Sequence, residues 1–125
     1  MPGSFSILIT DRNKHIRNFL ERELQAEGYN VHTAARFSEV LNILKSQLHF
    51  HLIILDLDMS DANEYPNMIM KILEIRPELP AIIHCFNEYV EFFEFSSNIH
   101  FVEKKAGSID VLKEITKNYK RVTCY

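Results

Sequence analysis

Short apolar runs alternate along the chain with longer segments of helical periodicity. The apolar runs are rich in β-branched and aliphatic side chains, as buried strands are, and they cover residues 5–10, 29–34, 52–55, 81–85 and 99–103. The segments between them repeat their apolar residues at helical spacing, over residues 13–28, 36–48, 66–76 and 108–122. The aromatic segment 87–97 fits either period, and its place between two strands favours a short, irregular helix.

This alternation predicts an α/β fold in a single domain spanning residues 1–125. Successive strands separated by helices form a parallel sheet that is covered on both faces. Because the crossovers are right-handed, every strand ends at the same edge of the sheet, where doubly wound folds bind their ligands. Asp11, Asp56 and Cys85 each end a predicted strand, so we expect them to gather there.

Two helices have clear apolar faces. In the first helix this face comprises Ile16, Phe19, Leu20 and Leu24. In the last helix it comprises Ile109, Leu112, Ile115, Tyr119 and Val122. Ser108 precedes that face and is a residue type that often caps a helix N-terminus. Gly28 suits the left-handed residue that follows many helices.

Composition places the chain among ordinary globular proteins. Apolar residues make up 46% of the 125 residues and charged residues 25%. The net charge of −3 gives no electrostatic basis for binding nucleic acid. Cys85 and Cys124 suggest no disulfide framework and fit a reducing compartment. With no signal-peptide pattern and no apolar run long enough to span a membrane, we expect a soluble, cytoplasmic protein with no membrane partner.

Five segments in order resemble the receiver domain of two-component response regulators. They are "ILITD" (7–11), "LQAEGYNVHTA" (24–34), "HLIILDLDM" (51–59), "RPELPAII" (76–83) and "FVEKK" (101–105). Each motif is weak alone, but their order and spacing make the resemblance nearly end to end. It implies a flavodoxin-like (βα)5 fold with strand order 2-1-3-4-5, which agrees with the alternation of strands and helices.

The resemblance also implies roles for single residues. Asp56 takes the position of the phosphoacceptor, and Asp11 that of the first acid of a metal-binding pair. The carbonyl of Asp58 takes the third metal-ligand position, and Lys104 that of the lysine that pairs with the phosphoryl group. Two carboxylates and a carbonyl suit Mg²⁺, which offsets the charge of the phosphoryl oxygens.

Signalling roles follow from the same resemblance. Cys85 takes the position of the switch hydroxyl and Phe101 that of the switch aromatic. A sensor histidine kinase is the implied phosphoryl donor. A homodimer or an effector contact is expected through residues 86–105 and the last helix, on the strand 4 to helix 5 face. The implied activity is that of a signalling domain, not of an enzyme.

Several residues depart from the family pattern. Arg12 replaces the second acid of the metal pair, and each unit-charge interaction there is worth roughly 3 kcal/mol at ~6 Å and an effective dielectric of ~20. Arg12 is therefore expected to weaken Mg²⁺ binding if it lies in the pocket, and to matter far less if it points to solvent. Cys85 is a poorer hydrogen-bond donor than a hydroxyl, and Phe86 replaces a small residue at the phosphoryl entrance. Lys105 replaces a proline whose preceding bond is commonly cis, so we expect a trans bond between Lys104 and Lys105.

Two functional hypotheses remain open. The first is a receiver that takes a phosphoryl group on Asp56; the second is a pseudo-receiver that keeps the fold as a phosphorylation-independent interaction module, as Arg12, Cys85 and Lys105 would favour. A flavin carrier or enzyme on this fold is disfavoured because the loop "TDRNKH" has no glycine with which to cradle a phosphate. His49 and His51 have a metal-like spacing but lack nearby cysteine or acid partners, so a surface pair is the favoured interpretation.

Overall fold

Five strands form one parallel sheet in the computed structural model, which describes residues 4–57, 65–86 and 98–123. The strands are β1 (Ser6–Thr10), β2 (Asn30–Ala34), β3 (Leu52–Leu55), β4 (Ala81–Cys85) and β5 (Ile99–Glu103). Their order in the sheet is β2-β1-β3-β4-β5, and every neighbouring pair is parallel. The predicted α/β fold, its strand order and its parallel sheet are therefore confirmed.

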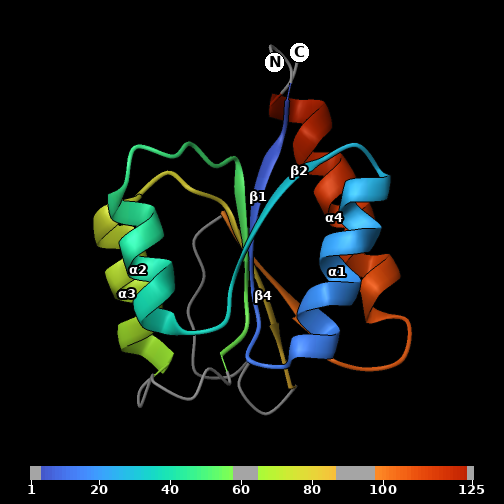
Figure 1. Ribbon diagram of the computed structural model, residues 1–125, viewed down its shortest axis with the longest axis horizontal. Coiled ribbons are helices and arrows are strands. Elements are labelled where there is room, and N and C mark those ends of the chain that lie inside the picture. The colour runs from blue at the N-terminus through green and yellow to red at the C-terminus, as the bar shows by residue number, and fades with distance from the viewer. Residues whose placement is uncertain (1–3, 58–64, 87–97, 124–125) are drawn as a thin grey trace.

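Helices cover both faces of this sheet (Figure 1). The described helices are α1 (Lys14–Ala26), α2 (Phe37–Lys45), α3 (Tyr65–Ile75) and α4 (Ser108–Thr123). α1 and α4 lie on one face, and α2 and α3 on the other. The short helix predicted over residues 87–97 falls outside the described residues.

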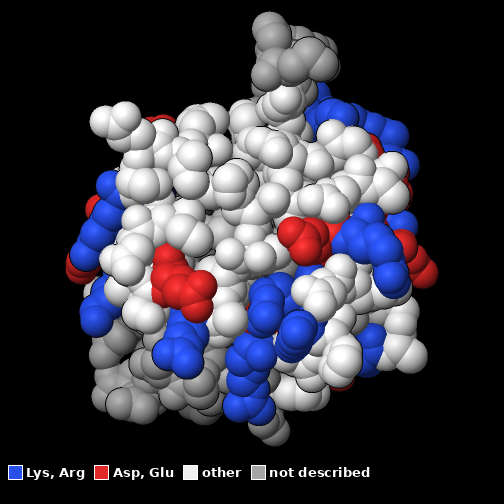
Figure 2. Space-filling view, in the orientation of Figure 1, with Lys and Arg blue, Asp and Glu red and all other residues white. Residues whose placement is uncertain are grey.

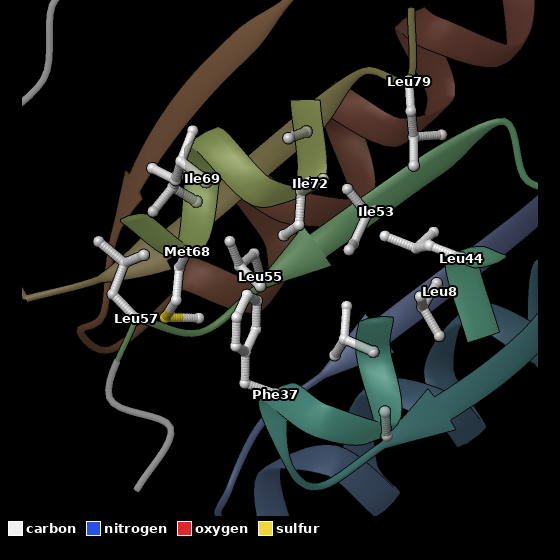
Figure 3. Packing of buried hydrophobic residues seen from close by; sticks show 14 of the residues in the cluster. Leu8, Phe37, Leu44, Ile53, Leu55, Leu57, Met68, Ile69, Ile72 and Leu79 are labelled. Atoms are coloured by element: carbon white, nitrogen blue, oxygen red, sulfur yellow. The ribbon is translucent and has the colours of Figure 1, made fainter. Parts of the chain in front are cut away.

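Alternate residues of each strand supply two separate cores. Ile7 and Ile9 of β1 pack toward α1 and α4, whereas Leu8 between them packs toward α2 and α3, and all three are fully buried. Figure 3 shows the core on the side of α2 and α3, where Leu8 and Ile53 of the sheet meet helical side chains. Burying each such side chain stabilises the fold by about 1.5–3 kcal/mol. This two-sided burial is why the strands read as continuous apolar runs.

The ends of α1 follow local capping chemistry. The side-chain Oδ1 of Asn13 accepts hydrogen bonds from the backbone N–H groups of His15, at 2.9 Å, and Ile16, at 3.1 Å. These bonds satisfy two donors that the first helical turn leaves unpaired. After the helix, Gly28 adopts a φ of 91°, as predicted for a left-handed terminating residue.

Three residues of the predicted helices, two on their apolar faces and one at an expected cap, behave differently from expectation. Phe19 is 39% exposed and Val122 75% exposed, so neither belongs to the buried stripe. The guanidinium of Arg22 lies 5.4 Å from the centre of the Phe19 ring and covers part of it. Ser108 is the first residue inside α4 and its hydroxyl pairs with His84, so it is not the cap that the sequence suggested.

Charged side chains are unevenly distributed on the face seen in Figure 2. Several Lys and Arg side chains form a cluster in the lower centre of this face, toward the edge at which the strands end, and others lie along its sides. By sequence, a basic residue lies within two positions of three strand ends, at Arg12, Arg36 and Lys104. This edge therefore carries positive charge around its buried acids. None of the helices in the described residues combines the length and the apolar character that a membrane span requires.

Candidate functional site

Two acids and a lysine meet at the edge where the parallel strands end. Asp11 follows β1, Asp56 follows β3 and Lys104 follows β5. The Nζ atom of Lys104 lies 2.7 Å from Oδ1 of Asp56 and 3.6 Å from Oδ2 of Asp11. Both carboxylates are 1% exposed and the lysine side chain 12%. The expectation that these three residues converge is confirmed.

Thr10 fixes the main chain of β3 next to Asp56. Its hydroxyl donates to the carbonyl of Ile54 and accepts from the backbone N–H of Asp56, each at 3.1 Å. Both bonds are buried, so they join the ends of β1 and β3 without competition from water. No sequence signal pointed to this role, because threonine is also an ordinary residue at the end of an apolar strand.

The surroundings of Asp11 disfavour its ionised form. Its Oδ1 accepts a hydrogen bond from the backbone N–H of Asn13 at 2.9 Å, whereas its buried Oδ2 accepts none from any described residue. Burial raises the pKa of Asp11 to about 6, and the neighbouring charge of Asp56 adds to that rise. The Asn13 N–H and the Lys104 cation oppose it and do not overcome it.

Arg12 touches the site only through its main chain. Its backbone N–H donates to Oδ2 of Asp56 at 3.3 Å, while its side chain is exposed. Within residues 4–57, 65–86 and 98–123, the guanidinium forms no ion pair with either acid. Of the two alternatives that the sequence left open, the structure supports the arginine that faces solvent. Asn13, which follows it, uses its side chain to cap α1.

The other predicted site residues lie around this centre. Cys85 is buried at the end of β4, and its carbonyl accepts a hydrogen bond from the N–H of Lys104 at 2.8 Å. Phe101 is partly buried and packs on the α2 and α3 side of the sheet. Phe86 is 50% exposed, and the Nζ of Lys104 lies 5.6 Å from its ring centre. Asp58 falls outside the described residues.

Lys105 points away from the acids. Its Nζ lies 3.7 Å from Oε1 of Glu103, and both side chains are well exposed. The described chain contains no cis peptide bond, so the bond between Lys104 and Lys105 is trans, as predicted. The two adjacent lysines therefore have opposite environments, one facing the buried acids and one facing solvent.

The site fits a divalent cation with oxygen ligands. Oδ2 of Asp11 is a buried acceptor without a hydrogen bond from a described residue, and its cationic neighbour, the Nζ of Lys104, lies 3.6 Å away. A divalent cation in direct contact would compensate its charge more fully. Asp56 lies close enough to raise the pKa of Asp11 by its charge. The described residues contain no group of three His, Cys, Asp or Glu side chains around a common point. Within the described residues, any ligand beyond these two carboxylates would therefore be a group of another kind, such as a backbone carbonyl.

Comparisons with known proteins agree with this geometry. The sequence model of the family "Response regulator receiver domain" matches residues 7–115. The chain is similar to a CheY-like response regulator receiver domain protein from Methanospirillum hungatei JF-1, with 24% identity, a TM-score of 0.80 and coverage of 94% of this chain and 95% of that one. It is also similar to the response regulator TrrA from Thermotoga maritima in complex with Mg(2+)-BeF, with 28% identity, a TM-score of 0.77 and coverage of 92% and 98%. A search among curated protein sequences gave no significant match.

Proposed function

The chain belongs to the response regulator receiver domain family, and we propose that its Asp56 accepts a phosphoryl group from a sensor histidine kinase. Domains of this family are signalling modules. The observation that carries the proposal is the position of Lys104, whose ammonium lies 2.7 Å from Asp56 at the carboxyl edge of the sheet. A fixed cation beside the acceptor oxygen can pair with the phosphoryl oxygens once they arrive.

The proposed transfer is a displacement at phosphorus. A carboxylate oxygen of Asp56 forms a bond to the phosphorus of a phosphohistidine, and the P–N bond breaks. The electron pair leaves with the imidazole, which takes up a proton. Lys104 and the backbone N–H of Arg12 already contact the two oxygens of Asp56, and so hold its carboxylate in place for attack. The basic residues at this edge favour the approach of an anionic donor.

Magnesium is the cation that we propose for this site. Asp11 and Asp56 would hold it by their side chains and Asp58 by its carbonyl, and the ion would offset the negative charge of the phosphoryl oxygens. The raised pKa of Asp11 supports this assignment, because a divalent cation would favour the ionised form that burial disfavours. Since the Arg12 guanidinium is exposed, the weakening of Mg²⁺ binding first expected from it should be small.

The signal is proposed to leave through β4, β5 and α4. Cys85 and Phe101 hold the positions of the switch residues, and the hydrogen bond from the Lys104 N–H to the Cys85 carbonyl joins the acid site directly to the end of β4. A homodimer or an effector would then contact residues 86–105 and the last helix. A phosphoryl group on Asp56 would compete with the two carboxylates for the Lys104 ammonium. It would therefore act on the residue whose backbone N–H joins the end of β5 to the end of β4.

A pseudo-receiver is the second candidate, and one observation favours it. The residue at the second-acid position, Arg12, gives the site a backbone N–H and no carboxylate. A site with two acids in place of three binds Mg²⁺ less tightly, and Lys104 already supplies a positive charge to both acids. Under this hypothesis the domain would bind its partners in one state only.

Phosphorylation by acetyl phosphate in the presence of Mg²⁺ separates the two candidates. The parent protein should gain one phosphoryl group by intact-protein mass spectrometry, and hydroxylamine should remove it, as expected for an acyl phosphate. Asp56→Asn should gain none, whereas Asp110→Asn, at an exposed position of α4, should behave like the parent. A folded parent protein that neither binds Mg²⁺ nor gains the group would establish the pseudo-receiver instead.

A further inference from the structure

His84 is a buried polar residue in an otherwise apolar strand. It lies within "AIIHC", the sequence of β4, and is 3% exposed. An aliphatic side chain would fill a core position without the cost of removing an imidazole from water. A histidine at this place therefore points to a role that its polar atoms perform.

The register of the sheet places His84 beside Asp56. β3 and β4 pair Ile54 with Ile82 and Leu55 with Ile83, so the next position brings Asp56 opposite His84. Since side chains alternate along a strand, His84 faces the same side as Ile82, toward α1 and α4. The charges of Lys104 and Asp56 both act on the pKa of His84, which burial lowers to about 4. The imidazole is therefore neutral near pH 7 and does not compete with Lys104 as a cation.

One ring nitrogen of His84 has a specific partner. Its Nε2 lies 3.0 Å from the hydroxyl oxygen of Ser108, and both residues are buried. The other nitrogen, Nδ1, is buried without a hydrogen-bond partner among the described residues. The contact with Ser108 is thus the hydrogen bond that the structure records for this ring, and it spans 24 residues of sequence.

That hydrogen bond holds the far end of the connection that carries Lys104. Residues 104–107 join β5 to α4, and the Lys104 N–H at their start donates to the carbonyl of Cys85 at 2.8 Å. At their end, the Ser108 N–H donates to the carbonyl of Lys105 at 3.0 Å, and its hydroxyl meets His84. Adjacent residues of β4 therefore fasten both ends of the connection.

We propose that His84 is a positioning residue for Lys104. By fixing Ser108 to β4, it sets the path of residues 104–107 and so keeps the Lys104 ammonium against Asp56 and Asp11. The effect of His84 on phosphorylation rests on the proposed function, whereas its effect on the position of Lys104 does not.

Three variants test the role. His84→Leu keeps an apolar side chain in the core but loses the hydrogen bond, and Ser108→Ala removes it from the other side with a good helix former. His84→Gln is the conservative variant, because its terminal amide reaches about as far as Nε2 and can still pair with Ser108. Ser108→Ala provides the test if His84→Leu does not fold.

The first readout is the side-chain ammonium resonance of Lys104 in NMR, assigned by its loss in Lys104→Met. A buried, ion-paired ammonium exchanges its protons slowly, so the signal should weaken in His84→Leu and Ser108→Ala and persist in His84→Gln. The second is the rate of Asp56 phosphorylation by acetyl phosphate at saturating Mg²⁺. The maximal rate should fall about 10- to 100-fold in the first two variants, as misplacement of a catalytic group does, while the Mg²⁺ affinity stays unchanged.

The double variant His84→Leu/Ser108→Ala should be phosphorylated no more slowly than the slower of the two single variants, because both substitutions remove the same contact. If folded His84→Leu and Ser108→Ala keep the ammonium signal, and their rates match the parent, the proposal is overturned even where Tm has fallen. Additive losses in the double variant would also contradict it. If the parent protein is not phosphorylated, the proposed function fails, but the ammonium signal still decides the role of His84.

Discussion

The two edges of the sheet treat their charged and polar groups in opposite ways. At the edge where strands begin, the guanidinium of Arg76 donates to three backbone carbonyls, those of Leu44 at 2.9 Å, Ser46 at 3.2 Å and Leu48 at 2.7 Å. At the edge where strands end, two buried acids share the ammonium of Lys104, and one oxygen of Asp11 accepts no hydrogen bond from a described residue. The first edge satisfies its cation with neutral acceptors; the second holds two like charges close together.

A histidine at the edge where the strands begin also has its polar atom satisfied by the main chain. Nδ1 of His51 accepts a hydrogen bond from the Ser6 N–H at 2.9 Å, and its ring stacks on Phe5 with a centroid distance of 4.9 Å. Burial and the neighbouring His49 lower the pKa of His51, which keeps its ring nitrogen free to accept. His51 is therefore part of the strand packing, whereas His49 is exposed, and the described residues offer no third ligand to the pair. The edge where the strands begin therefore stabilises the fold. The edge where they end is less stable than it could be, because it keeps two acids close together for function.

Removing Lys104 should cause the largest loss of stability at the edge where the strands end. Lys104→Met leaves two buried carboxylates without their cation, which should lower the free energy of unfolding by roughly 3–5 kcal/mol at pH 7. The loss should shrink at acidic pH, where the carboxyl groups are neutral. Lys105→Met is the matched control, because its exposed pair with Glu103 is worth under about 1 kcal/mol. Urea unfolding of both variants measures the difference, and equal effects would show that the buried ion pairs carry no special weight.

Replacing Asp11 should instead raise the free energy of unfolding at neutral pH. The folded protein holds this proton up to a pKa of about 6, above the usual 3.8, so the parent loses stability as pH rises between these values. Asp11→Asn keeps an oxygen to accept from Asn13 and removes the charge. It should be more stable than the parent above pH 6, by up to about 3 kcal/mol, and equal to it below pH 4.

Urea unfolding across this pH range, with a chelator present, tests the expectation for Asp11. The same variant should lose Mg²⁺ binding and phosphorylation of Asp56. A variant less stable than the parent at pH 7 would mean that the ionised acid stabilises the fold. Added Mg²⁺ should narrow the gap between parent and variant at pH 7, because it binds the parent alone.

At the edge where the strands begin, a substitution should lower stability and leave phosphorylation unchanged. Arg76→Ala leaves three carbonyls, in the last turn of α2 and directly after it, without this donor and should destabilise the protein by about 1–3 kcal/mol. Arg76→Lys should recover only part of this, since an ammonium cannot reproduce the planar fork of a guanidinium. Both variants should be phosphorylated at the parent rate at a temperature where they are folded. A slower rate in folded Arg76→Ala would show that the two edges are coupled.

The sequence predicted the fold well because the fold depends on patterns that are local. Apolar runs such as 52–55 and helical stripes each identify their element alone, and their alternation leaves few topologies. The errors lie where the last turn of a helix is exposed, as at Val122, or where a neighbour covers an exposed ring, as at Phe19. Local periodicity does not report what an element packs against.

The site was predictable only in part, for a related reason. Asp11 and Asp56 end strands, so their convergence follows from parallel topology, and the family resemblance adds Lys104. Thr10 and His84 act through hydrogen bonds to residues far along the chain. The first depends on the register between β1 and β3, and the second on how α4 packs against β4. Both are set by the packed fold as a whole, so neither partner could be predicted from its own segment.

Arg12 should show the smallest effect, although the sequence made it the most suspect residue. Its exposed guanidinium is screened by water and salt, and its contact with Asp56 uses a backbone N–H that every non-proline residue provides. Arg12→Ala should therefore change the Mg²⁺ dissociation constant by less than about 5-fold, equivalent to under about 1 kcal/mol.

Comparing two substitutions at this position separates the removed cation from the missing acid. Arg12→Ala removes the positive charge alone, whereas Arg12→Asp also adds the carboxylate that the family pattern has there. Any gain in Mg²⁺ affinity or Asp56 phosphorylation that appears only in Arg12→Asp measures the missing ligand. Isothermal titration of Mg²⁺ into both variants and the parent provides the comparison. A gain of tenfold or more in Arg12→Ala would instead place the guanidinium in the pocket and make Arg12 the reason for weak metal binding.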